Sequence, residues 1–463
     1  MTADGRLTFR QWLLLAVIVG IGALIALQAP PSASPKAMLG LGIVAATVLL
    51  WASAVIPAWA SGLLFFAAGL ASAIVPPLKL LSGFWSTAAM LILGGLILGA
   101  AAERSGLGRW IARGLVERFV TSYPRFLLGI LLGSGVLSFL VPATMGRLAL
   151  TIPIVGAIAK AAGYVAGSSG YNGAMLVTVA GNFLTSYAVL TGNLVNVIAI
   201  GTIEARHGPI IQYGEYLLYT LPVLGIVKGA TFLAIVVAFF SAPPPALPKP
   251  EDAPVLTPAG RRLSLLLAVT LLLWATDFWH RLPPGVVALA AGIVCLLPYP
   301  GLVTWRESFD PNKATAVLSL AAVLGVATVL THSGASDLIG RELARLAAVE
   351  GRSAIYGFSA IAVMSALTAT VATIVGAVAT VSPVIDVIAA ATGLSLKMGL
   401  IAELTGLQAV FFPFEAVPLM VGLAIARVPA RDALRALIPA AAVGLVVILP
   451  LQIGWLGLIG ALR

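Results

Sequence analysis

The segment LSFLVPATMGRLALTIPIV, residues 137–155, carries two prolines and an arginine inside an otherwise apolar run. A proline in a helix interior costs about 3 kcal/mol, and a charged side chain at the bilayer centre costs roughly 2.5–3.5 kcal/mol on insertion scales. A straight transmembrane helix would carry both penalties. If the chain turns at Pro142 instead, the proline ends one helix and Arg147 lies near the start of the returning one, where it faces protein rather than lipid. The segment therefore predicts the tip of a helical hairpin.

The whole chain has the composition of a membrane protein, with 60% hydrophobic and 10% charged residues, against about 25% charged residues in soluble domains. Many apolar runs approach the ~20 residues that a spanning helix needs. We predict an all-α polytopic membrane protein with about eleven transmembrane helices. They lie at 12–29, 38–55, 58–76, 86–103, 173–200, 216–240, 263–279, 284–301, 314–332, 398–425 and 436–459.

The net charge is +10, and many of the arginines lie in short loops between these runs, where basic residues set the orientation of a membrane protein. Orientation explains the charge without nucleic-acid binding. The loop charges favour a cytoplasmic N-terminus and an external C-terminus, in a multi-pass protein of the cytoplasmic (inner) membrane. The single Cys295 lies in an apolar run, and His207, His280 and His332 have no metal-ligand spacing. We therefore expect neither a disulfide nor a metal-ion centre built on histidine.

Two further apolar stretches, 126–160 and 354–389, are rich in small residues and broken in the middle. We predict that each enters the membrane, turns at a tip of small residues and leaves on the same side. Such re-entrant backbone is tolerated where protein or a water-filled cavity satisfies its polar groups. The loop charges agree, because a single span at 126–160 would move Lys160 outside and reverse every later loop.

The second half of the chain repeats the first. LILGGLILGAAAERSGLGRWIARGL (91–115) resembles LSLAAVLGVATVLTHSGASDLIGREL (318–343), and TIPIVGAIAKAAG (151–163) resembles VSPVIDVIAAATG (381–393). Interrupted spans follow, with VLTGNLVNVI at 189–198 and FFPFEAVPLM at 411–420. The first hairpin starts from inside and the second from outside, so the repeats are inverted. Inverted repeats with discontinuous helices are typical of secondary transporters.

This pattern divides the chain into four parts. Residues 1–85 are N-terminal scaffold helices, and 241–311 are a linker with further scaffold helices. Repeat 1 spans 86–240, with hairpin 126–160 and broken helix 173–200. Repeat 2 spans 312–463, with hairpin 354–389 and broken helix 398–425.

On these motifs the chain, over roughly 35–460, resembles the divalent anion–sodium symporter family, the solute carrier 13-like permeases of the ion transporter superfamily. The family has a span resembling GGLILGAAAERSGL, a hairpin tip with Ser-Asn-Thr ahead of a proline, and a broken helix with Gly-Thr-Pro-Pro-Asn. The resemblance implies a homodimer in the lipid bilayer. In each subunit, two tips and two broken helices would enclose one small anion and its coupling sodium ions, in a domain that moves against a scaffold.

The resemblance places the substrate and ion site at the tips and breaks. Gly192 and Asn196 match the glycine and asparagine of the first broken helix, and Asn193 stands in the threonine position. Pro142 and Arg147 match the ends of a tip variant. A sodium ion would lie near Thr144, Asn193 and Asn196. The full set of expected binding residues is Pro142, Ala143, Thr144, Gly146, Arg147, Thr191, Gly192, Asn193, Asn196, Thr370, Thr373, Pro413, Glu415 and Pro418.

The chemistry of these residues leaves alternatives open. Helix breaks expose N–H groups that bind anions and carbonyls that bind cations. Arg147 offers a fork of donors to an oxyanion, or forms a salt bridge with Glu415 that locks the two halves together. Glu415 binds a cation, carries a coupling proton, or pairs with Arg147 or Lys228. We expect Glu403 at the membrane interface and Asp386 facing external solvent.

The sequence departs from the family where sodium would bind. Both tips lack the signature asparagine, and Glu415 stands in place of a glycine. We therefore expect weaker dependence on Na⁺ than is usual for the family, with H⁺ coupling or anion exchange preferred.

These features predict a secondary active transporter of a small anion, either dicarboxylate- or citrate-like or an inorganic oxyanion, that works by elevator-type alternating access. They leave open the identity of the anion, the coupling ion and the direction. A cation–proton antiporter or metalloid efflux permease of the same superfamily is the alternative. Gly-x-Ser-x-Gly, His-Glu-x-x-His and the Gly-rich ATPase loop are absent from the sequence. We expect no enzyme activity and no cofactor, with Na⁺ or H⁺ as the coupling ion.

Overall fold

The computed structural model describes residues 8–28, 30, 33–53, 55–141, 144–244, 255–299, 301–308, 311–346 and 348–462. Over these residues the chain is helical and contains no β-strand. Pro142 and Ala143, two of the predicted tip residues, lie outside the described residues. Within that part of the chain, nine helices are long and apolar enough to cross a membrane, or up to ten if one bent pair counts as a span. The prediction of an all-α polytopic membrane protein is confirmed.

The predicted count of spans differs from this number for a physical reason. Two of the predicted spans, 58–76 and 284–301, contain only the shorter apolar helices Trp59–Ala71 and Pro284–Leu296. Two others, 173–200 and 398–425, are interrupted, so neither is one long helix. The first predicted hairpin, by contrast, contributes two helices to the count, Tyr123–Leu140 and Thr144–Ala161.

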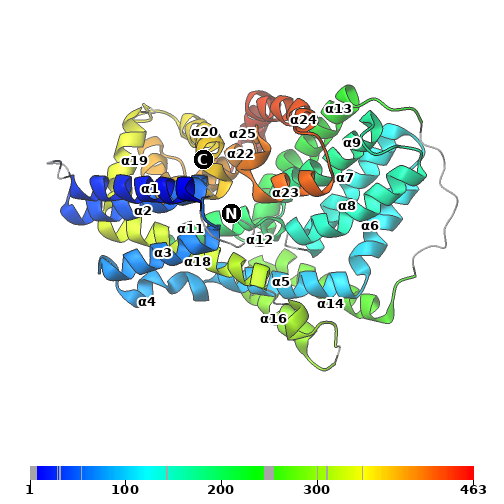
Figure 1. The fold of residues 1–463 in the computed structure, drawn as a ribbon, viewed down its shortest axis with the longest axis horizontal. Helices are drawn as coiled ribbons and strands as arrows, with labels where there is room; N and C mark the ends of the chain where they lie inside the picture. The colour runs from blue at the N-terminus through cyan, green and yellow to red at the C-terminus, as the bar shows by residue number, and fades with distance from the viewer. Residues whose placement is uncertain are drawn as a thin grey trace.

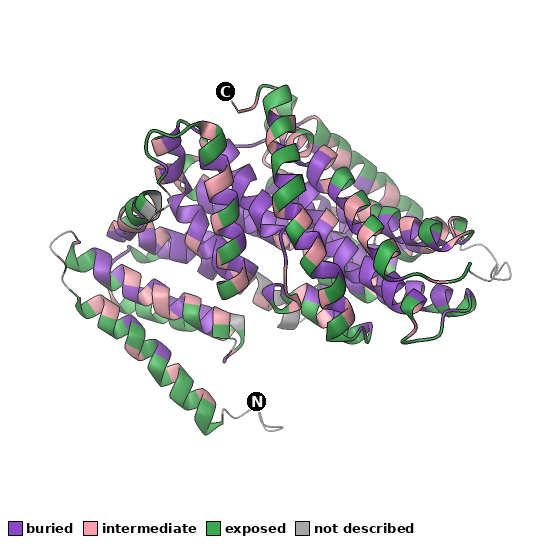
Figure 2. Ribbon diagram, turned by 90° about the horizontal axis from the view of Figure 1, so that it is seen from above, coloured by how far each residue is buried: buried purple, intermediate pink, exposed green. Residues whose placement is uncertain are grey.

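The N-terminal helices lie at the edge of the molecule. They are α1 (Phe9–Leu27), α2 (Pro35–Ser53), α3 (Ala58–Ala71) and α4 (Pro77–Leu80), followed by the 3₁₀ turn η1 (Ser82–Trp85). Only 11% of the apolar window in α1 is buried, and Figure 2 shows this helix as largely exposed beside the buried centre. Exposed apolar side chains such as Trp12 and Leu24 would be unfavourable in water. The surface therefore fits a surrounding of lipid or of another apolar protein face.

The first predicted hairpin is present. Helix α7 (Tyr123–Leu140) and helix α8 (Thr144–Ala161) each have 18 residues. The ring of Tyr164, just after α8, lies 5.5 Å from the ring of Tyr123 at the start of α7. It also stacks on Phe126, with the ring centroids 6.1 Å apart. After α8 the chain therefore returns to the end at which α7 began.

The second predicted hairpin is present as well. Helix α20 (Ala354–Val381) contains a break at Thr373, where φ is 64° and ψ is 164°. The returning arm continues through η6 (Ser382–Val384) into α21 (Ile385–Thr392). Thr392 at its end packs against Gly357 near its start, so closely that a Cβ on Gly357 would meet the threonine Oγ1. Both ends of this segment thus lie side by side.

The two halves contain the same elements in the same order. In the first half, α5 (Thr87–Arg104) is followed by Gly106 with φ 73° and then by α6 (Leu107–Arg118). In the second half, α18 (Pro311–Ser333) is followed by Gly334 with φ 82° and then by α19 (Ala335–Leu346), at an angle of 88° between the two helices. Ser105 and Ser333 each accept a hydrogen bond from the amide two residues on. Glycine fits both positions because L side chains rarely adopt a left-handed backbone.

Each hairpin is followed by an interrupted helix and a final bent helix. The first interrupted helix comprises α9 (Ser169–Leu176), η2 (Val177–Gly181), α10 (Asn182–Thr185), η3 (Ser186–Ala188), η4 (Leu190–Gly192) and α11 (Leu194–His207). The second comprises α22 (Leu396–Leu407), η7 (Pro413–Glu415) and α23 (Val417–Ile425). The bent helices are α12 (Tyr213–Thr220), η5 (Leu221–Val227) and α13 (Lys228–Phe239), and then α24 (Ala430–Val443), η8 (Gly444–Ile448) and α25 (Leu449–Leu458).

Four helices connect the two halves, namely α14 (Pro258–Ala275), α15 (Asp277–His280), α16 (Pro284–Leu296) and α17 (Trp305–Ser308). In Figure 1 the first hairpin and α6 lie on the side of the molecule opposite α19 and α20. In that view α22 and α23 of the second interrupted helix lie between them, and buried residues gather in the central region in Figure 2. The fold therefore brings the two tips and the two helix breaks towards its centre.

Candidate functional site

The first tip is organised by Arg147, whose side chain is fully buried. Its Nη1 donates to the carbonyl oxygens of Val141, at 2.6 Å, and Gly192, at 2.8 Å. Its Nε donates to Oδ1 of Asn182 at 2.9 Å, and its Nη2 donates to Oγ1 of Thr144 at 3.2 Å. One side chain thus joins the hairpin tip to the first interrupted helix on both sides of its break.

The sequence left two alternatives for the arginine, a ligand for the anion or a salt bridge with Glu415. Its donor fork faces neutral oxygens inside the protein instead of an open anion cavity. Among the described residues Arg147 forms no salt bridge with Glu415, so the alternative of a salt bridge between the two halves does not hold. The physical reason is burial, since a buried guanidinium needs acceptors close by and the unwound backbone supplies them.

The first break is held together by its asparagines. Asn193 caps α11, with Oδ1 accepting from the Val195 amide at 3.1 Å. Nδ2 of Asn196 donates to the carbonyls of Tyr187, at 3.3 Å, and Val189, at 2.9 Å. Oδ1 of Asn196 is buried and has no hydrogen-bond partner in the described part of the chain. The side-chain amide of Asn196 thus satisfies carbonyls of the unwound segment, and its own oxygen, Oδ1, stays available as an acceptor.

Gly192 is needed at this break for space. A Cβ there would lie 2.8 Å from the Ser186 carbonyl oxygen and 3.1 Å from the Val189 Cβ. Thr191, beside it, is also buried. The structure therefore brings five predicted residues together around one junction: Thr144, Arg147, Gly192, Asn193 and Asn196. Gly146, one residue before Arg147, lies on the exposed side of α8.

Glu415 organises the second break. Its Oε1 accepts from the amides of Phe411, at 3.0 Å, and Phe412, at 2.9 Å. Its Oε2 is buried and has no partner in the described part of the chain. The salt bridge with Lys228, the other predicted pairing, is absent from the same residues. Pro413 starts η7 and Pro418 lies in the first turn of α23, so the two prolines mark the ends of this break.

The threonines of the second tip have local roles in the structure. Oγ1 of Thr370 donates to the Ala366 carbonyl one helical turn before it, at 2.9 Å. Oγ1 of Thr373 accepts from the amide of Gly376 at 3.4 Å, as a cap of the returning arm. Both hydroxyls therefore already have a partner in the hairpin itself.

Two buried charged residues were not predicted as parts of the centre. Glu403 of α22 was expected at the membrane interface, yet it is fully buried, and both carboxylate oxygens lie 2.8 Å from Oγ of Ser382. Lys228 is also buried, and its Nζ donates to the Gln408 carbonyl at the C-terminal end of α22. A signal for Glu403 was its position inside the apolar run GLIAELTGL. Its partner lies on another segment, which sequence proximity does not reveal.

Polar pairs also join the two halves nearer the surface. Lys397 at the start of α22 pairs with Glu215 of α12. Nδ2 of Asn172 in α9 donates to Oδ2 of Asp432 in α24 at 2.7 Å. Asp386, expected to face solvent, forms a partly buried ion pair with Arg206 at 3.0 Å.

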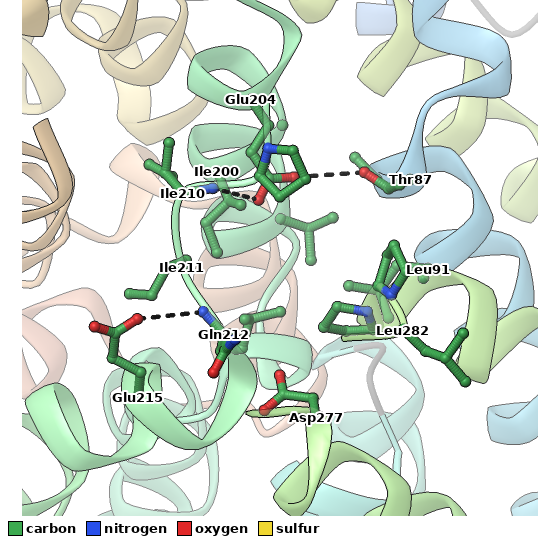
Figure 3. A pocket seen from close by; sticks show the side chains of 18 of the residues that line it. Thr87, Leu91, Ile200, Glu204, Ile210, Ile211, Gln212, Glu215, Asp277 and Leu282 are labelled. Carbon is green, nitrogen blue, oxygen red and sulfur yellow. Dashed lines mark hydrogen bonds between the residues drawn. The ribbon is translucent and has the colours of Figure 1, made fainter. Parts of the chain in front are cut away.

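A cavity lies away from this junction. It has a volume of about 640 Å³ and is bounded by α5, α11, α12 and the segment 277–285. Figure 3 shows the acidic side chains of Glu204, Glu215 and Asp277 around it. Glu204 accepts from the Thr87 hydroxyl and the Ile210 amide, and Glu215 accepts from the Gln212 amide. The cavity's lining includes none of the predicted binding residues. The cavity therefore lies between α5 and α11 of the first interrupted helix, and it is not the space between the hairpin tips.

Comparison with known proteins agrees with this architecture. Residues 8–462 match the model of the family described as "Sodium:sulfate symporter transmembrane region". The chain belongs to this family. The resemblance to the divalent anion–sodium symporters inferred from the sequence motifs is confirmed.

Two curated relatives are similar over much of the chain. A "Membrane protein" of Cupriavidus necator is 23% identical over 354 residues, which are 70% of this chain and 68% of that protein. The "Sodium-dependent dicarboxylate transporter SdcS" of Staphylococcus saprophyticus is 22% identical over 362 residues, 72% of this chain and 69% of the relative. Among solved structures, the YdaH transporter of Alcanivorax borkumensis is similar with a TM-score of 0.57 at 17% identity. The match covers 96% of both chains, and at this identity it concerns the fold alone.

Proposed function

We propose that this family member is a secondary active transporter of a small anion, of the dicarboxylate, citrate or inorganic oxyanion class. The observation that carries the proposal is the junction of tip and break around Arg147. There the buried guanidinium of Arg147 contacts Thr144 at the start of α8 and Gly192 just before α11. Helix N-termini and a nearby positive charge both favour an anion. The sodium-dependent dicarboxylate relative supports the same class of cargo.

Elevator-type movement is the mechanism that fits the fold best. The two halves interlock, because Gly422 of α23 packs against Leu148 of the first hairpin, with its Cβ position 3.0 Å from the leucine Cδ1. Hairpins, breaks and final helices would then move as one body. The remaining helices, α1 to α5 and α14 to α18, would form the scaffold, with α6 and α19 as connecting arms. The cavity beside α5 lies between these two groups.

The hairpin, interrupted helix and bent helix of each repeat, within 86–240 and 312–463, supply the two halves of that moving body in this proposal. The N-terminus would be cytoplasmic and the C-terminus external, in the inner membrane, as the loop charges favour. A homodimer would cover part of the apolar surface of the N-terminal helices. Crosslinking in intact membranes tests the dimer, and accessibility of a cysteine introduced at Ser34, in a Cys295→Ser background, tests the orientation.

Transport is tested with the purified protein in proteoliposomes. Exchange of radiolabelled succinate, citrate or sulfate against the same unlabelled anion should exceed that of empty liposomes. A matched pair of variants controls for the site: Gly192→Ala should lower exchange, and Gly135→Ala should not, because a Cβ at Gly135 meets no atom within 4 Å. Absence of exchange for every anion in the panel would refute the proposal.

The second candidate function is cation–proton or metalloid exchange. The observation in its favour is that Glu403 and Glu415 are buried without an ion pair in the described residues. Buried carboxylates are typical of proton pathways. Movement of protons driven by Na⁺, K⁺ or arsenite in the same liposomes, with none driven by anions, would favour this function.

A further inference from the structure

Each of the two helix breaks has a backbone carbonyl bound by a buried cationic side chain. At the first break the Gly192 carbonyl accepts from Arg147 at 2.8 Å. At the second break the Gln408 carbonyl accepts from Lys228. Carbonyls at such interruptions have no helical amide partner, and in transporters with broken helices they bind the coupling cation.

The acceptors around Arg147 have the character of ligands for a hard cation. They are two backbone carbonyls, one hydroxyl and one amide oxygen, from Val141, Gly192, Thr144 and Asn182. Carbonyl and hydroxyl oxygens are the ligands that alkali and alkaline-earth ions prefer. Here the same oxygens point at a guanidinium. A sodium ion near Thr144, Asn193 and Asn196, as the resemblance implies, does not fit, because the arginine already binds Oγ1 of Thr144 and its charge would repel the ion.

The second break leads to the same conclusion from an independent residue. Lys228 belongs to the first half of the chain, at the start of α13, yet it reaches the end of α22 in the second half. It is 3% exposed. Neither Lys228 nor Arg147 forms an ion pair within the described residues. Burial of an unpaired charge is unfavourable. Because each of these two buried charges lies at a helix break, we infer that the breaks require a positive charge.

We propose that Arg147 and Lys228 are built-in replacements for the coupling cations, and that this family member moves its anion without Na⁺. The inference rests on the proposed anion transport. It deepens that proposal, because it says which ion the site does not use. Both act as positioning groups whether or not Na⁺ is present: Arg147 holds the first tip to the first break, and Lys228 holds α13 to the second break.

The first experiment needs no transported substrate. Thermal unfolding of the purified protein in detergent is measured in rising NaCl against choline chloride at equal ionic strength. The wild type should show the same Tm in both salts. In Arg147→Gln, which keeps amide donors but removes the charge, Na⁺ should raise Tm relative to choline in a saturable manner. A saturable Na⁺-specific rise in the wild type would overturn the inference.

The second experiment measures anion exchange in proteoliposomes with Na⁺ replaced by choline. The wild-type rate should change less than twofold, and Arg147→Lys, which keeps a tethered charge, should also remain independent of Na⁺. Arg206→Gln is the control, because that arginine pairs with Asp386 outside the breaks. Exchange that occurs only with Na⁺ would refute the inference and leave the proposed function standing. If no anion moves at all, the proposed function fails and the Tm comparison alone decides the inference.

Discussion

The ammonium of Lys397 forms an ion pair with the carboxylate of Glu215, which joins the start of α22 in the second half to α12 in the first half. A second contact repeats this connection with the halves exchanged. Asn172 of α9 in the first half donates to Asp432 of α24 in the second half. Glu215 and Asp432 each occupy the third position of their helix. In both cases a helix that precedes a break is held by the bent helix of the other half.

The Lys397–Glu215 pair should therefore contribute to stability, although modestly. Its side chains are 32% and 26% exposed, and exposed pairs measured by double-mutant cycles give about 0.2–1 kcal/mol. We expect a coupling near the upper end from a cycle of Lys397→Ala and Glu215→Ala. The pair of Arg345 and Glu342, which are 72% and 58% exposed, is the control and should show a coupling near zero. A larger coupling for the control would contradict the role of burial.

Replacement of Arg147 by methionine should lower the thermal stability substantially. The change removes four hydrogen bonds and leaves the Val141 and Gly192 carbonyls without their donor. An unsatisfied buried polar group costs about 1–3 kcal/mol, so a fall in Tm of several degrees is expected in detergent. Arg345→Met removes an exposed arginine and should leave Tm unchanged. Equal Tm values for the two variants would show that the arginine does not hold the tip.

Gly192→Ala should reduce both stability and exchange rate. The added methyl would lie 2.8 Å from the Ser186 carbonyl oxygen, and overpacking of this kind costs roughly 1–3 kcal/mol. Gly135→Ala meets no atom within 4 Å and lies inside α7, where alanine is favoured over glycine by up to about 1 kcal/mol. The two alanine variants should thus shift Tm in opposite directions. A shared direction would count against the close packing at the break.

Glu415→Gln should fold and should alter the response of transport to pH. The amide oxygen of glutamine can still accept from the Phe411 and Phe412 amides, as Oε1 does now. The variant removes a carboxyl group at this break that could take up a proton. We expect wild-type exchange to vary with pH and the variant's rate to stay flat between about pH 5.5 and 8. Glu350→Gln, an exposed position, is the control. A wild-type pH profile retained by Glu415→Gln would assign proton sensitivity elsewhere.

The sequence revealed the elements of the fold well because their signals are local. A proline and an arginine in an apolar run marked the first tip, and small residues with interrupted patterns marked both breaks. The contacts of the buried polar side chains could not be predicted, because their partners are distant in the sequence or belong to the backbone. Arg147 donates to backbone carbonyls, which every residue has, so no residue type in the sequence indicates this contact. Glu403 was misplaced because its partner, Ser382, comes from another segment, the returning arm of the second hairpin.

The contact between Arg147 and Gly192 has an energetic consequence for a complete transport cycle. A cation that is covalently attached returns with the carrier in every cycle, so it is never released into a solution where its concentration is lower. In the proposed cycle it would supply no work from an ionic gradient. The highest accumulation ratio for the cargo would then be set by the counter-anion that leaves or by the proton-motive force. Growth on a low external concentration of the anion would depend on the internal pool of its exchange partner rather than on external salt.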